Sequence, residues 1–371
     1  MSTFHPLRVT AVDRLTDDSV ALTFAVPPEL RPLYGYSPGQ HIALRRHRPG
    51  ADALTASTEV RRTYSLCAPA CDEPSELRIG IRGVEGGDFS SYAVKELRPG
   101  DTVDVLPPTG RFVLEPRPGR FAAVVGGSGI TPVLSIAATL LAREPQARFC
   151  LIRSDRSTAS TMFLEEVADL KDRYPDRFQL VTALSREEQQ SGLPSGRLDE
   201  ERLSALLPSL LPAEDVDGWY LCGPLGLVEG ASRALRGLGV PRGRIHQEIF
   251  HVTEAPAAST ASSRSTASGS GPAADAGGAR SASVTANLDG RSGCWPMDDG
   301  ESVLETVLRH RADAPFACKG GVCGTCRVRL VSGEVRMDRN YALEADELEA
   351  GYVLACQSHP LTEAVEVDFD G

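Results

Sequence analysis

The sequence predicts a multidomain chain: an antiparallel β-barrel, a doubly wound α/β domain with a parallel sheet, and a small C-terminal module rich in cysteine. A length of 371 residues exceeds that of one ordinary domain. Short strands give way to strand–helix alternation after Phe112. All but three of the 28 residues at 255–282 are Ala, Ser, Gly, Pro or Thr. The predicted parts are 1–113, 114–252, a linker at 253–282, and 283–371.

The barrel is predicted from short segments of alternating β-branched residues separated by Pro and Gly. These segments are LRVTAVDRL, VALTFAVP, GQHIALRR, LRIGIRGV and DTVDVLPP. The α/β domain starts with RFAAVVGGSGITPVLSIAATLLARE, which has the pattern of a strand, a glycine turn and a helix with Pro132 in its first turn. Later strand patterns, ARFCLIRS, FQLVTALS and GWYLCGP, alternate with helical segments, which predicts a mostly parallel sheet.

The linker has no bulky apolar residue that could offset the entropy lost on ordering, so we expect it to be flexible. The net charge of −11 argues against a nucleic-acid partner. From Ser283 to Gly371 there are 16 acidic and 8 basic residues, a net charge of −8. This acidity fits either electrostatic docking on a basic partner or an ordinary solvated surface.

A cytoplasmic location is expected. No stretch approaches 18 uninterrupted apolar residues, and the N-terminal MSTFHPLRVTAVDRL lacks a charged-then-apolar signal pattern. In a reducing compartment, metal or redox use explains nine cysteines better than a disulfide framework does.

The strongest local signal is Cys318-x₄-Cys323-x₂-Cys326, followed after 29 residues by Cys356. This is the plant-type spacing for a [2Fe–2S] cluster. Nearby glycines free backbone N–H groups to point at the sulfurs; these are Gly320, Gly321 and Gly324. A zinc site normally shows two C-x₂-C pairs, a thioredoxin-like C-x-x-C leaves two thiols unexplained, and a Rieske centre needs two His ligands. Ordinary thiols are expected at Cys67, Cys71, Cys150 and Cys294.

The segment GGSGITP at 126–132 follows a strand and opens a helix, which suits a pyrophosphate at the helix N-terminus. Gly127 and Gly129 would let the backbone approach closely. Pro132 replaces the third glycine of the dinucleotide fingerprint, so a purely structural turn remains an alternative.

Five motifs in one order resemble the ferredoxin–NADP reductase family over roughly residues 5–250. They are RRTYSL (61–66), GGDFSSY (86–92), PPTGRF (107–112), GGSGITP (126–132) and CGP (222–224). The resemblance implies a flavin-binding barrel followed by a nicotinamide-binding domain. The C-terminal module resembles a plant-type ferredoxin, which implies an α+β β-grasp fold with Cys318, Cys323, Cys326 and Cys356 as cluster ligands.

For the flavin, the resemblance implies that Arg62 pairs with phosphate, Tyr64 packs on the isoalloxazine and Ser65 bonds near the reactive nitrogen. A surface Arg and a core Tyr in an ordinary strand are the alternative. Contacts to the flavin pyrophosphate are implied for Gly87 and Ser90. Stacking of Tyr92 on an adenine would favour FAD over FMN.

For the coenzyme, the resemblance implies catalytic roles for Ser65, Cys222 and Glu248. Further coenzyme contacts are implied for Gly127, Gly129, Thr131 and Gly223. Phe250 is a candidate to cover the flavin ring where nicotinamide must enter. A buried structural Cys222 and an ordinary strand aromatic at Phe250 remain alternatives.

The loop SDRSTAS (154–160) suggests NADPH, because Arg156 and Ser157 suit a 2′-phosphate, with Arg197 as a helper. An acidic residue in this loop would instead favour NAD, because it can bind the ribose hydroxyl. Asp155, next to Arg156, is such a residue. Arg156 could also be a solvated loop charge.

These expectations give a reductase that takes a hydride, which carries two electrons, from NADPH. FAD separates the two electrons, and the [2Fe–2S] cluster passes them on one at a time. No helical Glu-x-x-His pairs for oxygen activation are found in the sequence, so we expect a separate oxygenase partner. The resemblance extends to the reductases of phenylacetyl-CoA epoxidase and ketosteroid 9α-hydroxylase systems. The resemblance favours a partner that is a multi-subunit di-iron epoxidase acting on an aromatic acyl-CoA. The alternative is a partner of the ketosteroid 9α-hydroxylase or Rieske type, with NADH as the donor and FMN as the flavin. The linker would either let the module swing or simply tether it.

Overall fold

The computed structural model describes residues 3–48, 58–189, 193–251, 282–311, 313–316, 318–343 and 345–371. It divides into two compact units, one comprising Met1–His251 with Phe316–Thr325, the other Val252–Pro315 with Cys326–Gly371. The predicted linker, except for its last residue, lies outside the described residues.

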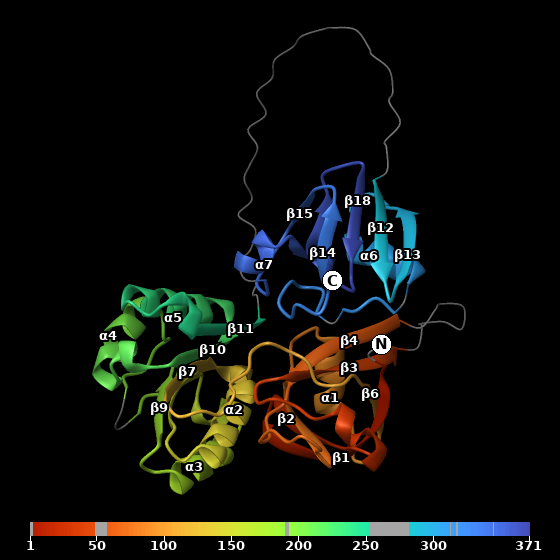
Figure 1. The fold of residues 1–371 in the computed structure, drawn as a ribbon. Helices are drawn as coiled ribbons and strands as arrows, with labels where there is room; N and C mark the ends of the chain where they lie inside the picture. The colour runs from red at the N-terminus through yellow and green to blue at the C-terminus, as the bar shows by residue number, and fades with distance from the viewer. Residues whose placement is uncertain are drawn as a thin grey trace, which may run out of the picture. The chain divides into compact units, whose positions relative to one another are not determined.

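The first unit begins with a six-stranded antiparallel barrel (Figure 1). Its strands and short helices are β1 (His5–Thr16), β2 (Ser19–Ala25), η1 (Pro28–Leu33), β3 (His41–Arg48), β4 (Thr58–Ser65), β5 (Glu76–Arg82), α1 (Asp88–Lys95) and β6 (Thr102–Val105). The strand order is β4-β3-β6-β1-β2-β5, and a bridge between Leu66 and Ile79 joins the two edges. The alternating residues Leu77, Ile79 and Ile81 on β5 are fully buried in the barrel core, as their period of two predicts. The barrel prediction is therefore confirmed.

A five-stranded parallel sheet follows. Its elements are β7 (Arg120–Gly126), η2 (Gly127–Gly129), α2 (Ile130–Arg143), β8 (Arg148–Asp155), η3 (Thr158–Ser160), α3 (Leu164–Arg173), β9 (Phe178–Leu184), α4 (Glu200–Leu210), η4 (Ala213–Asp215), β10 (Gly218–Pro224), α5 (Leu225–Gly237), η5 (Arg242–Arg244) and β11 (Ile245–His251). Every neighbouring pair of strands is parallel. Figure 1 shows α2 and α3 on one face of the sheet and α4 and α5 on the other. The doubly wound prediction is confirmed.

The strand order β11-β10-β7-β8-β9 reverses direction at β7. The chain runs outward from β7 through β8 to β9, then returns to place β10 on the other side of β7. In open α/β sheets, ligands bind at such a switch point, beyond the carboxyl ends of the strands. The glycine turn at 127–129 and the CGP segment both lie at this point.

The second unit contains a mixed five-stranded sheet of order β13-β12-β18-β14-β16 and a two-stranded sheet of β15 and β17. Its elements are β12 (Ser283–Leu288), β13 (Arg291–Pro296), α6 (Val303–His310), β14 (Arg327–Ser332), β15 (Val335–Met337), α7 (Ala345–Glu349), β16 (Tyr352–Leu354), η6 (Ala355–Gln357), β17 (Ser358–Pro360) and β18 (Ala364–Asp368). The capping box of Ser302 and Glu305 begins α6, which buries Val303, Leu304 and Val307. One helix packed on a small mixed sheet agrees with the α+β prediction.

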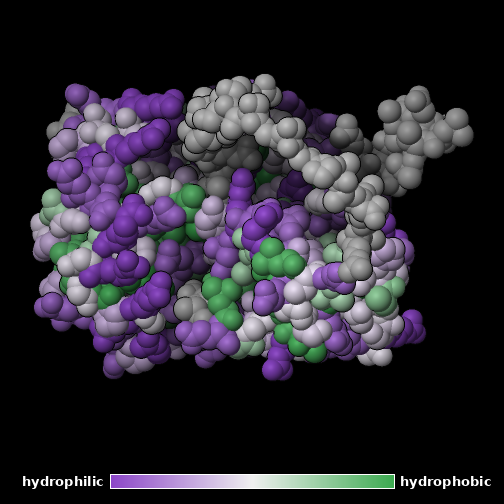
Figure 2. All heavy atoms as spheres, turned by 90° about the horizontal axis from the view of Figure 1, so that it is seen from above, coloured by the Kyte–Doolittle hydropathy of each residue, from purple (hydrophilic) through white to green (hydrophobic). Residues whose placement is uncertain are grey.

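No helix in the described ranges is both long enough and apolar enough to cross a membrane. On the face seen in Figure 2, hydrophobic areas are small and separated by hydrophilic side chains.

Candidate active site and cluster-binding loop

The glycine turn and the CGP segment, 95 residues apart, pack directly against each other. A Cβ on Gly129 would overlap the carbonyl oxygen of Cys222, and one on Gly223 would lie 2.9 Å from the backbone nitrogen and oxygen of Gly126. Gly127 has a φ of 55° and Gly223 a φ of 144°, which also favour glycine. The hydroxyl of buried Thr131 donates to the Ser128 carbonyl at 2.9 Å and stabilises the turn.

Residues from the barrel and from the parallel sheet meet at the switch point. Glu248 on β11 pairs in register with Cys222 on β10. The carboxyl of Glu248 is hydrogen-bonded by the buried Ser65 hydroxyl at the end of β4 and lies 3.8 Å from Nδ1 of His41 on β3. The structure thus brings together the three predicted catalytic residues. Phe250 is partly buried and packs against the same core cluster as Cys222.

Burial determines the protonation states in this cluster. It raises the pKa of Glu248 to about 8, with the Ser65 hydrogen bond opposing the shift. Burial also lowers the pKa of His41 to about 4 and raises the pKa of the Cys222 thiol well above its usual range. Near neutral pH all three groups are therefore mainly uncharged. Within the described residues Oε2 of Glu248 is buried without a hydrogen-bond partner, which leaves one polar atom available to a bound ring.

The R-x-Y-S segment lies on β4 with alternating orientation. Arg62 is exposed, and its guanidinium donates to the Arg61 carbonyl at 2.7 Å. The Tyr64 ring lies 5.7 Å from that of Phe89 on α1, and burial raises the pKa of its phenol. An exposed guanidinium two residues from a half-buried aromatic ring fits a phosphate and a flat ring system.

Gly87 precedes α1, and Ser90 lies in its first turn. A Cβ on Gly87 would lie 2.6 Å from Oγ of Ser90, so only glycine leaves this turn open. The Ser90 hydroxyl accepts a hydrogen bond from the Val84 backbone N–H at 3.1 Å. The Tyr92 ring is covered by the guanidinium of Arg46, whose Cζ lies 3.7 Å from the ring centroid. The barrel therefore offers a small-residue turn and a stacked cation–π pair next to β4.

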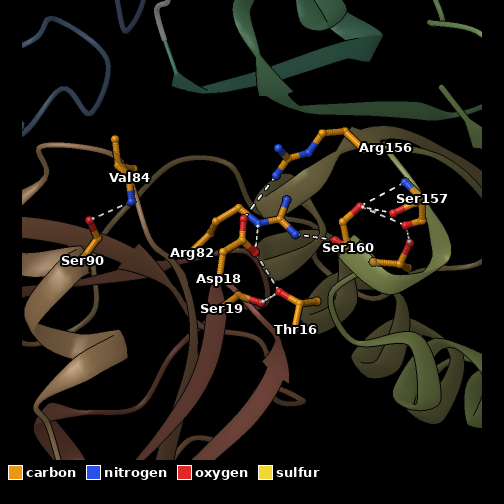
Figure 3. A network of polar contacts seen from close by, with 10 residues as sticks. Thr16, Asp18, Ser19, Arg82, Val84, Ser90, Arg156, Ser157 and Ser160 are labelled. Atoms are coloured by element: carbon orange, nitrogen blue, oxygen red, sulfur yellow. Dashed lines mark hydrogen bonds and ion pairs between the residues drawn. The ribbon is translucent and has the colours of Figure 1, made fainter. Parts of the chain in front are cut away.

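The loop after β8 contains the predicted 2′-phosphate residues (Figure 3). Arg156 is exposed and forms an ion pair of 3.2 Å with Asp18. The Ser157 and Ser160 side chains close a capping box around η3. Asp155 turns inward, where its carboxylate accepts from buried Arg153 at 2.9 Å. The acid next to Arg156 in the sequence is therefore directed away from the loop surface. Arg197 is exposed on a separate loop.

The loop at 318–325 contains two of the four predicted cluster ligands, and its backbone is left-handed at Lys319, Gly321 and Gly324. The Gly320 N–H donates to Sγ of Cys318 at 3.4 Å, and Sγ of Cys323 lies 3.2 Å from the Thr325 hydroxyl. A hydrogen bond from the Cys323 thiol, with backbone N–H groups, holds the pKa of Cys318 well below its usual range. The same hydrogen bond raises the pKa of the Cys323 thiol, so the pair shares one proton. A loop that stabilises a thiolate with backbone N–H donors fits an iron–sulfur cluster.

Cys326 and Cys356 are buried in the second unit, where the Ala355 N–H donates to the Cys326 carbonyl at 3.0 Å. All nine cysteines are free of disulfides. Within the described ranges, no three His, Cys, Asp or Glu side chains are arranged as a metal site. The features that fit a cluster are therefore the four thiols and the left-handed backbone of the loop at 318–325.

Several residues at the site carry no signal in the sequence. His41, Asp18 and Arg82 come from separate parts of the barrel and meet the α/β domain only through the fold. Arg82 donates to the Ser160 carbonyl, and a Cβ on Gly127 would lie 2.9 Å from its guanidinium. A cation thus lies beside the glycine turn, where a pyrophosphate is expected.

Three family models match the chain. They are an oxidoreductase FAD-binding domain at residues 6–114, an oxidoreductase NAD-binding domain at 124–233, and a 2Fe-2S iron-sulfur cluster binding domain at 287–361. The chain belongs to the family of flavin- and [2Fe–2S]-containing reductase components of multicomponent oxygenases.

Two curated relatives cover nearly the whole chain. It is 41% identical to one of the subunits of 1,2-phenylacetyl-CoA epoxidase from Escherichia coli K12, over 100% of this chain and 99% of the relative. It is 31% identical to the ferredoxin reductase component of 3-ketosteroid-9-alpha-monooxygenase from Rhodococcus rhodochrous, over 98% and 96% respectively. The solved structure of phthalate dioxygenase reductase matches with a TM-score of 0.60 and 24% identity, over 99% of this chain and 98% of that one. This last likeness supports the fold.

Proposed function

We propose that this chain is the NADPH-dependent reductase of a phenylacetyl-CoA epoxidase. The observation that carries the proposal is the meeting of Ser65, Cys222 and Glu248 at the switch point of a chain that also contains the four-cysteine spacing. A bound FAD would supply the chemistry that joins the two cofactors, since a flavin can accept one hydride, which carries two electrons, and give up those electrons one at a time to a [2Fe–2S] cluster.

The residues at the switch point orient the reacting rings and keep water out. Ser65 and Glu248 form one hydrogen-bonded pair, which holds both side chains in place. Cys222 supplies a small uncharged surface for the nicotinamide, since its thiol stays protonated. Phe250, which packs against the same cluster as Cys222, would cover the ring of a bound flavin at the place where nicotinamide must enter. A largely neutral site avoids a fixed charge beside rings whose charge changes during the transfer.

The remaining predicted residues bind the cofactors in this proposal. The flavin is held by Arg62, Tyr64, Gly87 and Ser90, with Tyr92 under the adenine. The coenzyme is held by Gly127, Gly129, Thr131 and Gly223, and the four thiols Cys318, Cys323, Cys326 and Cys356 bind the cluster. Arg82 beside Gly127 adds a cation for the coenzyme pyrophosphate.

NADPH is favoured over NADH by the orientation of the loop charges. Asp155 is engaged by buried Arg153, so this acid is not directed at a ribose hydroxyl, while Arg156 is exposed. Replacing Arg156 by Gln is expected to raise the KM for NADPH about tenfold or more and to leave that for NADH within about twofold. Steady-state oxidation of both coenzymes with an artificial acceptor measures this. Equal effects on both would contradict the assignment.

The partner is proposed to be a multi-subunit di-iron epoxidase acting on phenylacetyl-CoA, in the cytoplasm. Support comes from the relative that is 41% identical over the full chain. Reconstitution tests this proposal: the chain is combined with the oxygenase of a phenylacetyl-CoA epoxidase or of a 3-ketosteroid monooxygenase. NADPH consumption coupled to epoxide formation is expected only with the first. Coupling only with the second would overturn the partner while leaving the reductase chemistry intact.

A further inference from the structure

The turn between β1 and β2 contacts the loop after β8. Oδ2 of Asp18 lies 3.2 Å from a guanidinium nitrogen of Arg156, although the two residues are 138 positions apart. Both side chains are about half-exposed, at 41% for Asp18 and 51% for Arg156. A solvated pair of this kind contributes little stability but can be exchanged for another partner.

The position of Asp18 is fixed from several sides (Figure 3). The Thr16 hydroxyl donates to Oδ1 at 2.8 Å and Nε of Arg82 donates to the same oxygen at 3.2 Å. The Asp18 carbonyl accepts from the Gly83 N–H at 2.7 Å. These bonds leave Oδ2 directed at Arg156. Partial burial alone would raise the pKa of Asp18, but Thr16 and the two guanidinium groups lower it below its usual value, so the group is an anion at neutral pH.

A carboxylate on a guanidinium is a close chemical substitute for a phosphate, since both are oxyanions that accept two N–H donors. Asp155, the other acid beside Arg156, is engaged by Arg153 in the interior. Within the described residues, Asp18 is the acid that forms an ion pair with Arg156.

Building on the proposed binding of a 2′-phosphate by Arg156, we propose that Asp18 is a specificity-determining counter-anion that holds Arg156 until the coenzyme phosphate displaces it. Each binding event then exchanges one oxyanion for another on Arg156. At Arg156, Asp18 lowers the net affinity for the 2′-phosphate of NADPH, which NADH lacks.

The experiment measures binding of 2′,5′-ADP and of 5′-AMP, which lacks only the 2′-phosphate, by calorimetry to the full chain and to Asp18→Asn, Asp17→Asn, Arg156→Gln and the Asp18→Asn/Arg156→Gln double variant. Asn keeps Oδ1 as an acceptor for Thr16 and Arg82, and equal melting temperatures check that the turn is retained. Asp17 is the exposed neighbour and loses the same charge. Asp18→Asn should bind 2′,5′-ADP about two- to fivefold more tightly and 5′-AMP unchanged. Asp17→Asn should change neither, and the gain should vanish when Arg156 is Gln.

Three results would overturn the inference. The first is that Asp18→Asn binds 2′,5′-ADP no more tightly than the wild type, and the second is that Asp17→Asn gains as much affinity as Asp18→Asn. The third is that the gain in affinity persists in the double variant. The third result would indicate general charge repulsion rather than competition for Arg156. If Arg156→Gln weakens 2′,5′-ADP while Asp18→Asn has no effect, the inference fails and the NADPH assignment stands. If Arg156→Gln has no effect, both fail.

Discussion

At the scale of single residues, the protonation of Glu248 is coupled to folding. Its pKa of about 8 lies above the ordinary carboxyl value of 4.5. Between these values the folded protein holds a proton that the unfolded chain has released, so the stability this group contributes is present at low pH and is lost as pH rises through about 8.

Glu248→Gln should remove that dependence. From about pH 6.5 to about pH 8.0 the wild type should lose on the order of 1–2 kcal/mol of unfolding free energy relative to the variant. His41 is uncharged in the folded protein across this window and titrates at its ordinary pKa of 6.5 when unfolded, so it changes the stability of both proteins equally and cancels in the comparison. Thermal unfolding of both proteins across the window measures the difference. Parallel curves for the two proteins would show that Glu248 is ionised in the folded state.

At the scale of elements, the contact between the glycine turn and CGP makes a steric prediction. Gly129→Ala places a methyl group against the Cys222 carbonyl and should cost about 1–3 kcal/mol and weaken coenzyme binding. Gly226→Ala is the matched control, because nothing lies within 4 Å of an added Cβ there in α5. It should stabilise by about 0.5–1 kcal/mol. Melting temperatures and coenzyme titrations of the two variants test this prediction. Equal stability and equal coenzyme affinity in the two variants would mean that the glycine turn can shift to accept a methyl group.

The elements were largely predictable, and the site only in part. Alternation and glycine turns predicted the barrel and parallel sheet because they are local signals. The order of the motifs resembles that of the reductase family, and this resemblance predicted that Ser65, Cys222 and Glu248 belong to one site. The pairing of Asp18 with Arg156 and of His41 with Glu248 could not be predicted, because each joins residues far apart through tertiary structure alone. The inward turn of Asp155 depends on Arg153, whose burial the sequence does not reveal.

At the scale of the whole molecule, the electron path is divided between modules. Cys356→Ser should lose the cluster absorbance and the reduction of a one-electron acceptor, while NADPH still reduces the flavin, because the flavin and coenzyme sites lie in other domains. Cys294→Ser, which changes an exposed thiol on β13 outside the motif, should retain both activities. Iron content and acceptor reduction of the two variants measure the contrast. Loss of iron from both would argue against the four-cysteine assignment.

Transfer of electrons from NADPH through FAD to the cluster within this chain is tested most directly by rapid anaerobic mixing of the purified protein with NADPH, followed at separate flavin and cluster wavelengths. We expect flavin bleaching to come first and cluster bleaching to follow it, with the second phase missing in Cys356→Ser. Cluster bleaching without prior flavin reduction, or a protein that contains zinc in place of iron, would contradict this path.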